Sequence, residues 1–376
     1  MARRRERLKR KSWGRALLWS FSALYGAAMV VRRWLYELGA LRSRRLRAKV
    51  ICIGNLTTGG TGKTPAVLLA ATTLRRRNHA VAILSRGYGR RAVNGEVLTL
   101  LDEEAPPWTK CGDEPWMMHQ ALHGQNIPIL VSSDRVKAGE VATNYYHSRT
   151  LILDDGFQHL RLKRDLDVVL LNAVDPFGGG ALLPLGNLRE PARALSRAHM
   201  IVITHSDRVP ADELETLKDV VKSLNPTAPV LEAAHRPDFL LDLRSSKRTK
   251  LSHLEGRKVV SLCGIGEPAN FEEQLERLGA VVAQKWRYPD HHPYTPREIR
   301  SLENVRAGLP VVTTFKDFTR FPKDWKNLLE DDVFALAIKL DILKGRNVWI
   351  DTLLRVAGTP AALEPDAESL DKAEAE

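Results

Sequence analysis

Apolar positions along the chain follow two patterns, short continuous runs and helical spacing. Short runs rich in β-branched residues stand at 50–53, 80–84, 127–131, 150–153, 168–172 and 200–204. Between them, stretches with helical spacing of apolar residues cover 66–74, 115–122, 135–145 and 212–223. Because buried strands that alternate with helices are typical of a parallel sheet with covered faces, the pattern predicts an α/β fold.

The pattern changes near the proline-rich stretch at 226–229. Beyond a polar, basic segment at 243–250, strands are expected at 259–263, 281–283, 310–314 and 333–338, with a helix at 270–278. These elements predict a second, smaller α/β domain. The predicted division is an N-terminal arm (1–49), a first domain (50–227), a smaller second domain (228–357) and a tail (358–376). The tail is acidic and rich in Ala and Pro, a composition typical of disorder.

The arm contains an apolar run of sixteen uncharged residues, 16–31, between Arg15 and Arg32. A helix that spans a bilayer needs about 20 apolar residues. We therefore predict a membrane-associated helix that lies in the interface, with its Trp and Tyr side chains at headgroup depth. A spanning helix and a helix packed on the protein are the alternatives. A cleaved signal peptide is not expected, because no small-residue cleavage site follows the run.

The formal net charge of +12 comes from this arm alone. Residues 1–49 hold fifteen Lys or Arg and two acidic residues, whereas the remaining 327 residues hold 42 basic and 43 acidic residues. A basic block beside an apolar helix favours an anionic membrane surface rather than nucleic acid as the partner. The three cysteines lie far apart and show no disulfide or metal-binding spacing, which fits a reducing compartment.

A glycine-rich segment links the first strand to the first helix. It reads Thr57-Thr58-Gly59-Gly60-Thr61-Gly62-Lys63-Thr64. Strand, glycine-rich loop and helix together predict a P-loop, in which backbone N–H groups bind phosphates. Lys63 would reach the β/γ-phosphates and Thr64 would bind Mg²⁺. The strict pattern has Gly where this chain has Thr57; a chance Gly-Lys-Thr in a turn is the alternative.

Carboxylates follow two predicted elements. Asp154 and Asp155 end the strand at 150–153, where P-loop enzymes hold Mg²⁺ directly or through water. A polar turn after the strand, capped by Asp154, is the alternative. Asp113 and Glu114 precede the helix at 115–122. Asp113 is either a general base that accepts a hydroxyl proton or the cap of that helix.

Three further segments carry weaker signals. Residues 85–90 (Ser-Arg-Gly-Tyr-Gly-Arg) suit phosphate or sugar contact, and the long loop at 178–191 has the length of a functional loop. The pair His291-His292 lacks partners for a metal site. It gains a role only if the fold brings it to the P-loop.

Together these segments resemble the tetraacyldisaccharide 4′-kinase family, the lipid A 4′-kinases. The resemblance rests on 54–65, 85–90, 112–115, 153–159 with 164–167, 182–191 and 289–294, in that order along the chain. It implies transfer of the γ-phosphate of ATP, with Mg²⁺, to the 4′-hydroxyl of an acylated glucosamine disaccharide 1-phosphate. It also implies work at the cytoplasmic face of the inner membrane of a Gram-negative bacterium.

The resemblance also implies roles for individual residues. Asp113 resembles the general base, paired with His291 of the second domain, and Arg189 resembles a phosphate or substrate contact. The expected metal ligands are Thr64, Asp155, Gln158 and Glu190. Asp154 is expected among the catalytic groups, together with Lys63 and Asp155. His205 stands where a lysine is expected.

Two other classes compete with a kinase. A P-loop GTPase-like membrane switch predicts a guanine-reading Asn-Lys-x-Asp, but the nearest segment, Thr204-His205-Ser206-Asp207, lacks Asn and Lys. A non-catalytic membrane scaffold would not explain why Lys63, Asp113 and the Asp154-Asp155 pair occur together.

Overall fold

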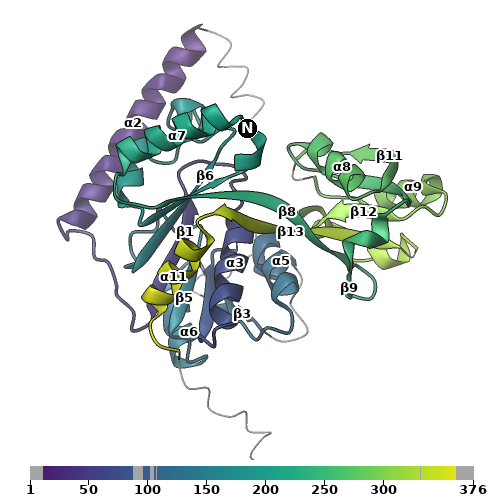
Figure 1. Ribbon diagram of the computed structural model, residues 1–376, viewed down its shortest axis with the longest axis horizontal. Coiled ribbons are helices and arrows are strands. Elements are labelled where there is room, and N and C mark those ends of the chain that lie inside the picture. The colour runs from purple at the N-terminus through teal and green to yellow at the C-terminus, as the bar shows by residue number, and fades with distance from the viewer. Residues whose placement is uncertain are drawn as a thin grey trace, which may run out of the picture.

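A computed structural model describes residues 12–87, 96–101, 106, 108–290, 292–330 and 332–360. Their thirteen strands form one sheet, in the order β11-β10-β12-β13-β8-β7-β6-β1-β5-β2-β4-β3, with β9 paired to β8. Figure 1 shows two lobes of unequal size, and the sheet runs through both. The predicted α/β class is therefore confirmed, but the two lobes share one continuous sheet.

The larger lobe, here called the kinase lobe, contains the strands expected from the apolar runs. They are β1 (Lys49–Asn55), β2 (Val81–Ser85), β4 (Ile129–Val131), β5 (Thr150–Asp154), β6 (Leu166–Asn172) and β7 (Met200–Thr204). All of these pair in parallel, and the short β3 (Leu98–Leu100) joins the edge antiparallel to β4. Both faces of this sheet are covered.

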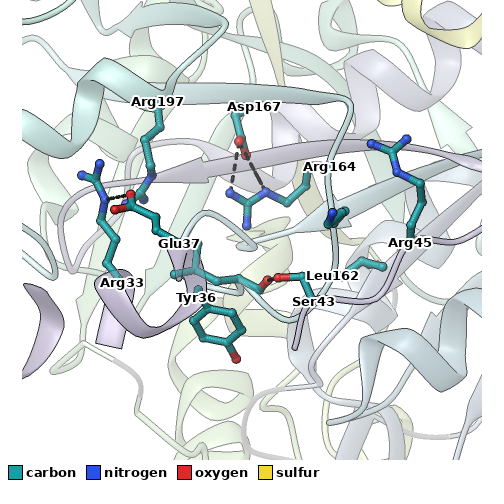
Figure 2. A pocket seen from close by; sticks show the side chains of 11 residues that line it. Arg33, Tyr36, Glu37, Ser43, Arg45, Leu162, Arg164, Asp167 and Arg197 are labelled. Carbon is teal, nitrogen blue, oxygen red and sulfur yellow. Dashed lines mark hydrogen bonds and ion pairs between the residues drawn. The ribbon is translucent and has the colours of Figure 1, made fainter. Parts of the chain in front are cut away.

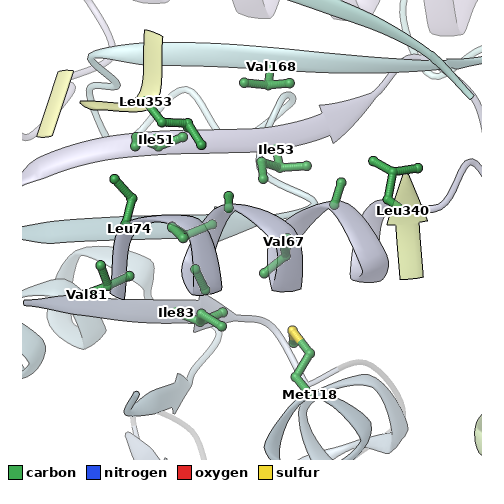
Figure 3. Close-up of a cluster of buried hydrophobic side chains, with 14 of the residues drawn as sticks. Ile51, Ile53, Val67, Leu74, Val81, Ile83, Met118, Val168, Leu340 and Leu353 are labelled. Carbon is green, nitrogen blue, oxygen red and sulfur yellow. The ribbon is translucent and has the colours of Figure 1, made fainter. Parts of the chain in front are cut away.

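Helices cover the kinase lobe from both sides. The covering elements are α3 (Lys63–Arg75), α4 (Trp108–Cys111), α5 (Asp113–Leu122), α6 (Arg135–Asn144), α7 (Ala211–Leu224) and α11 (Arg346–Ala357). Apolar side chains of α3 interdigitate with those of β1 and β2, and Leu340 and Leu353 close the same cluster (Figure 3). This packing places the N-terminal end of α3 at the carboxyl end of β1, where the P-loop lies.

The smaller lobe carries the remaining elements. It contains β9 (Arg248–Thr249), β10 (Lys258–Cys263), α8 (Pro268–Arg277), β11 (Val281–Arg287), α9 (Pro296–Arg306), β12 (Val311–Thr314) and α10 (Phe315–Phe318). Two long antiparallel strands, β8 (Val230–Asp242) and β13 (Val333–Lys344), run from one lobe into the other (Figure 1). Helix α11 follows β13 and packs on α3 and β1. The domain boundaries at 227 and 357 stay a prediction, and the last part of the chain returns to the kinase lobe.

Helix α2 (Ser12–Glu37) lies along the outer side of the kinase lobe (Figure 1). Its buried residues are Gly14, Leu18, Ser22 and Gly26, one per turn. Large apolar side chains elsewhere on it are exposed, among them Trp13, Trp19, Phe21, Leu24 and Trp34. Among the described residues, α2 is the one helix that is long and apolar enough to cross a membrane. A helix is confirmed; its depth in a bilayer stays a prediction, as does the disorder of the tail beyond residue 360, which lies outside the described residues.

Candidate active site

The P-loop connects β1 to α3 and is held from two sides. Gly62 adopts a left-handed conformation (φ 80°, ψ 29°) that favours glycine, and a Cβ there would lie 2.0 Å from Nε2 of His235. The Asn55 amide donates to Thr61 Oγ1 over 2.9 Å, and the Thr204 hydroxyl donates to the Thr61 carbonyl over 3.1 Å. A loop supported in this way at a helix N-terminus is suited to bind phosphate.

The first half of the P-loop contacts the long loop at 178–191. The Thr58 N–H donates to the Asn187 carbonyl over 2.8 Å, and Thr57 forms an isolated β-bridge with Leu188. Gly59 has φ 134° and, with Gly60, has open space where a side chain would stand. The residues expected to cradle phosphate, Thr57 through Thr64, therefore form one continuous loop and helix start.

Lys63 points to the carboxylate of Asp155. The Lys63 Nζ lies 3.8 Å from Asp155 Oδ1, and the Arg189 guanidinium donates to both Asp155 oxygens over 2.9 Å. The same guanidinium lies 3.5 Å from Gln158 Oε1. The structure thus brings together four of the expected site residues from three separate segments. Asp155 has φ 48°, an unusual value for a residue other than glycine, directly after β5.

Asp154, which is buried, and Glu114, which is partly buried, form a second group of carboxylates near Lys63. Asp154 accepts a hydrogen bond from Ser85 over 2.9 Å, while its Oδ1 is buried without a partner in the described part of the chain. Burial, and then the charge of Asp155, raises the pKa of Asp154 to about 6. Burial, and then Asp154, raises the pKa of Glu114 to about 7. In the sequence, only the position of Glu114 next to Asp113 indicated that it belongs to the site.

Asp113 lies in the first turn of α5 and does not cap it. The cap position is Gly112, and the Asp113 carboxylate accepts from the Glu114 N–H over 3.0 Å and from Arg320 over 3.1 Å. Arg320 is buried and follows α10 in the smaller lobe, so the pair joins the two lobes. Sequence reasoning missed Arg320. His291, the expected partner of Asp113, lies outside the described residues, and the neighbouring His292 pairs with Glu298 over 3.0 Å.

The four expected metal ligands are not all in contact. Thr64 follows Lys63 in α3, and Asp155 and Gln158 share the Arg189 guanidinium. Glu190 instead forms an ion pair with Arg197 over 2.7 Å. Among the described residues, no group of three His, Cys, Asp or Glu side chains has the arrangement of a metal site.

Comparisons with known proteins agree on one family. The family model Tetraacyldisaccharide-1-P 4'-kinase matches residues 14–356. Tetraacyldisaccharide 4'-kinase of Elusimicrobium minutum (strain Pei191) is 42% identical over 343 residues, which is 91% of each chain, and that of Anaeromyxobacter sp. (strain K) is 39% identical over 344 residues, 90% of each. The chain belongs to the tetraacyldisaccharide-1-phosphate 4′-kinase family.

A solved structure of the family supports the same assignment. The crystal structure of "apo" form LpxK from Aquifex aeolicus in complex with ATP is similar with a TM-score of 0.73 and 30% identity. The similarity covers 92% of this chain and 99% of that one. The resemblance seen in the sequence is thereby confirmed, and with it the α/β fold and the class of phosphotransferase that acts on a hydroxyl group.

His205 differs from the lysine expected for the family at this position. It has φ 54°, and its Nε2 lies 2.9 Å from Nδ1 of His235, the ring that packs against Gly62. Burial lowers the pKa of His205, and burial followed by the neighbouring His205 lowers the pKa of His235 to about 3. Both rings are therefore neutral near pH 7. Asp207, in the segment where a GTPase would read guanine, instead pairs with Arg236 over 2.8 Å.

Proposed function

We propose that this member of the family transfers the γ-phosphate of ATP to the 4′-hydroxyl of tetraacyldisaccharide 1-phosphate in lipid A biosynthesis. The observation that carries the proposal is the junction of a P-loop lysine with Asp155 and Arg189, beside the carboxylates of Asp113 and Glu114. Phosphoryl transfer depends mainly on positioning and on stabilising charge. Lys63 and Arg189 supply positive charge to the phosphoryl group, and Asp113 accepts the proton of the attacking hydroxyl.

The acceptor hydroxyl would approach from the side of the smaller lobe. Asp113 stands where the lobes meet, held by Arg320, and we assign His291 as its second partner. Since the base and its partners come from different lobes, movement of the smaller lobe along β8 and β13 would change the geometry of proton transfer. We therefore treat 50–227 and 228–357 as the two functional domains, with α11 packed on the first.

The residues around Lys63 fit a magnesium ion. The unpartnered oxygen of Asp154 and the raised pKa of Glu114 indicate more buried carboxylate than the protein's own cations neutralise. Mg²⁺ prefers oxygen ligands and usually keeps waters and substrate phosphates in its shell. Thr64, Asp155 and the free oxygen of Asp154 would hold it, and Gln158 is a further candidate, whereas Glu190 would first have to leave Arg197. When bound, the ion neutralises charge on the phosphates.

A membrane surface is the proposed second partner, and nucleic acid is not. The exposed apolar side chains of α2 suit the interface of a bilayer. At the C-terminal end of α2 a pocket of 260 Å³ is lined by more basic than acidic side chains (Figure 2). The basic ones are Arg33, Arg45, Lys163, Arg164 and Arg197, and the acidic ones are Glu37 and Asp167. Such a cluster attracts anionic headgroups. We propose that the enzyme acts at the cytoplasmic face of the inner membrane of a Gram-negative bacterium.

Transfer of label from ATP tests the proposed function. Purified full-length protein is incubated with γ-labelled ATP, Mg²⁺ and tetraacyldisaccharide 1-phosphate in detergent micelles. We expect label in a lipid that carries a second phosphate. GTP hydrolysis without labelled lipid would instead favour a membrane-associated switch protein. If folded protein turned over no nucleotide in the presence of lipid, both the lipid kinase and the GTP-hydrolysing switch protein would be excluded.

A further inference from the structure

Helix α2 makes three side-chain hydrogen bonds to the backbone of the site loops. The Tyr25 hydroxyl donates to the Arg189 carbonyl over 2.9 Å, and the Ser22 hydroxyl donates to the Leu182 carbonyl over 2.9 Å. Arg32 donates to the carbonyl of Gln158 over 3.1 Å. A helix that served only to hold the protein on a membrane would not need polar contacts with residues of the phosphate site.

The packing of α2 aligns these donors with the site. Ser22 and Gly26 lie on the stripe that faces the protein, and a Cβ at Gly26 would come within 2.6 Å of the Leu182 side chain. The helix therefore approaches the loop at 178–191 closely. Tyr25 directly precedes Gly26 and is half-buried, and the charge of Glu190 acts on its hydroxyl. Burial raises the pKa of Tyr25, so that its hydroxyl remains a donor at neutral pH.

Tyr25 holds Arg189, whose backbone N–H and carbonyl both form hydrogen bonds. The Arg189 N–H donates to the carbonyl of Leu56, at the start of the P-loop, over 2.7 Å, while its carbonyl accepts from Tyr25. The guanidinium of Arg189 then bonds both oxygens of Asp155, which faces Lys63. A chain of direct contacts thus leads from the membrane-facing helix to the P-loop lysine.

We propose that Tyr25 is a positioning residue of the kinase site, which acts through Arg189 and makes the docked helix α2 part of the catalytic apparatus. The hydroxyl of Tyr25 sets the backbone of Arg189, and this backbone sets the guanidinium against Asp155. One helix then couples two events. The exposed face of α2 contacts the membrane, and the hydrogen bonds on its protein-facing side position the groups that act on phosphate at the P-loop. This inference rests on the proposed kinase function.

The substitution Tyr25→Phe isolates the hydroxyl. Its matched control is Tyr146→Phe, because Tyr146 is a half-buried tyrosine outside α2 whose hydroxyl has no hydrogen-bond partner within the described residues. In mixed micelles with saturating ATP and lipid, Tyr25→Phe should lower kcat about three- to tenfold, the factor that corresponds to one neutral hydrogen bond. Tyr146→Phe should match the wild type, and both should co-sediment with anionic vesicles as the wild type does.

A double-mutant cycle tests whether Tyr25 acts through Arg189. If it does, adding Tyr25→Phe to Arg189→Gln should change kcat by less than about twofold, because the guanidinium to be positioned is gone. An undiminished loss in the Arg189→Gln background would overturn the proposal, as would a Tyr25→Phe variant with wild-type kcat. A loss of vesicle binding equal to the loss of kcat would assign Tyr25 to anchoring instead.

A second pair of variants keeps the test independent of one substitution. Ser22→Ala removes the bond to Leu182, whereas Ser20→Ala changes an exposed serine of the same helix. We expect a lower kcat for Ser22→Ala only; equal activities of the two would count against a positioning role of α2. Failure of the wild type to phosphorylate the lipid would refute the proposed function, whereas an active wild type with unaffected α2 variants refutes this inference alone.

Discussion

Replacing Glu114 by glutamine should stabilise the nucleotide-free protein at neutral to alkaline pH. Burial, and then the charge of Asp154, raises the pKa of Glu114 from 4.5 to about 7. Between these values the folded protein holds a proton that the unfolded chain has released. The free energy of unfolding therefore falls as pH rises through this window, because stability falls wherever the folded state binds more protons.

The size of the effect follows from the pKa difference. A difference of about 2.5 pKa units corresponds to roughly 3 kcal/mol at pH values above both pKa values. Glutamine has nearly the same volume and no charge, so it removes this cost. Below about pH 4 the two proteins should be nearly equally stable, because Glu114 is then largely protonated in both the folded and unfolded states.

Urea unfolding from about pH 5 to pH 8, without nucleotide and Mg²⁺, measures this difference. The matched control is Glu140→Gln, which changes an exposed glutamate on α6. We expect the stability of the Glu114→Gln variant relative to wild type to grow with pH, and that of Glu140→Gln to stay level. Parallel pH curves for wild type and Glu114→Gln would refute the view that buried, excess carboxylate charge surrounds the P-loop lysine.

Other substitutions test single features of the site and of the helix. Lys63→Ala should abolish lipid phosphorylation and leave the circular dichroism spectrum unchanged; near-wild-type turnover would exclude a role of Lys63 on phosphate. Asp113→Asn should lower kcat by about 10²–10⁴, as expected for a general base, and full activity would exclude that role. Trp19→Gln combined with Leu24→Gln should release the protein from anionic vesicles after a high-salt wash, since salt removes only the electrostatic part of binding. Retention of this variant after the wash would shift membrane contact away from the exposed face of α2.

Elements of the kinase lobe were predictable because their signals are local. The apolar runs at 150–153 and 200–204 became β5 and β7 with at most one residue of difference, and the glycine-rich loop became a P-loop. Continuous burial on both faces leaves a strand few polar positions, so its sequence is easily read. The second lobe's strands at 259–263 and 333–338 followed the same rule, although β13 extends to Lys344.

What escaped prediction depends on contacts between distant segments. Strand β8 was missed because its centre, from His235 to Asp238, is only partly buried or exposed and carries no apolar run. Arg320 lies 207 residues from Asp113, and no pattern in a single sequence joins them. The hydrogen bond of Tyr25 could not be predicted, because Tyr25 lies inside an apolar run whose composition indicates a membrane-associated helix.

We expect the chain to phosphorylate one hydroxyl of a glycolipid at a site built on the P-loop. Mass-spectrometric fragmentation of the lipid product, made from ATP by full-length protein, locates the added phosphate. It should lie on the distal glucosamine, at its 4′ position, be formed by the wild type and be lost with Lys63→Ala. A phosphate on another hydroxyl, or release of inorganic phosphate with an unmodified lipid, would contradict this expectation.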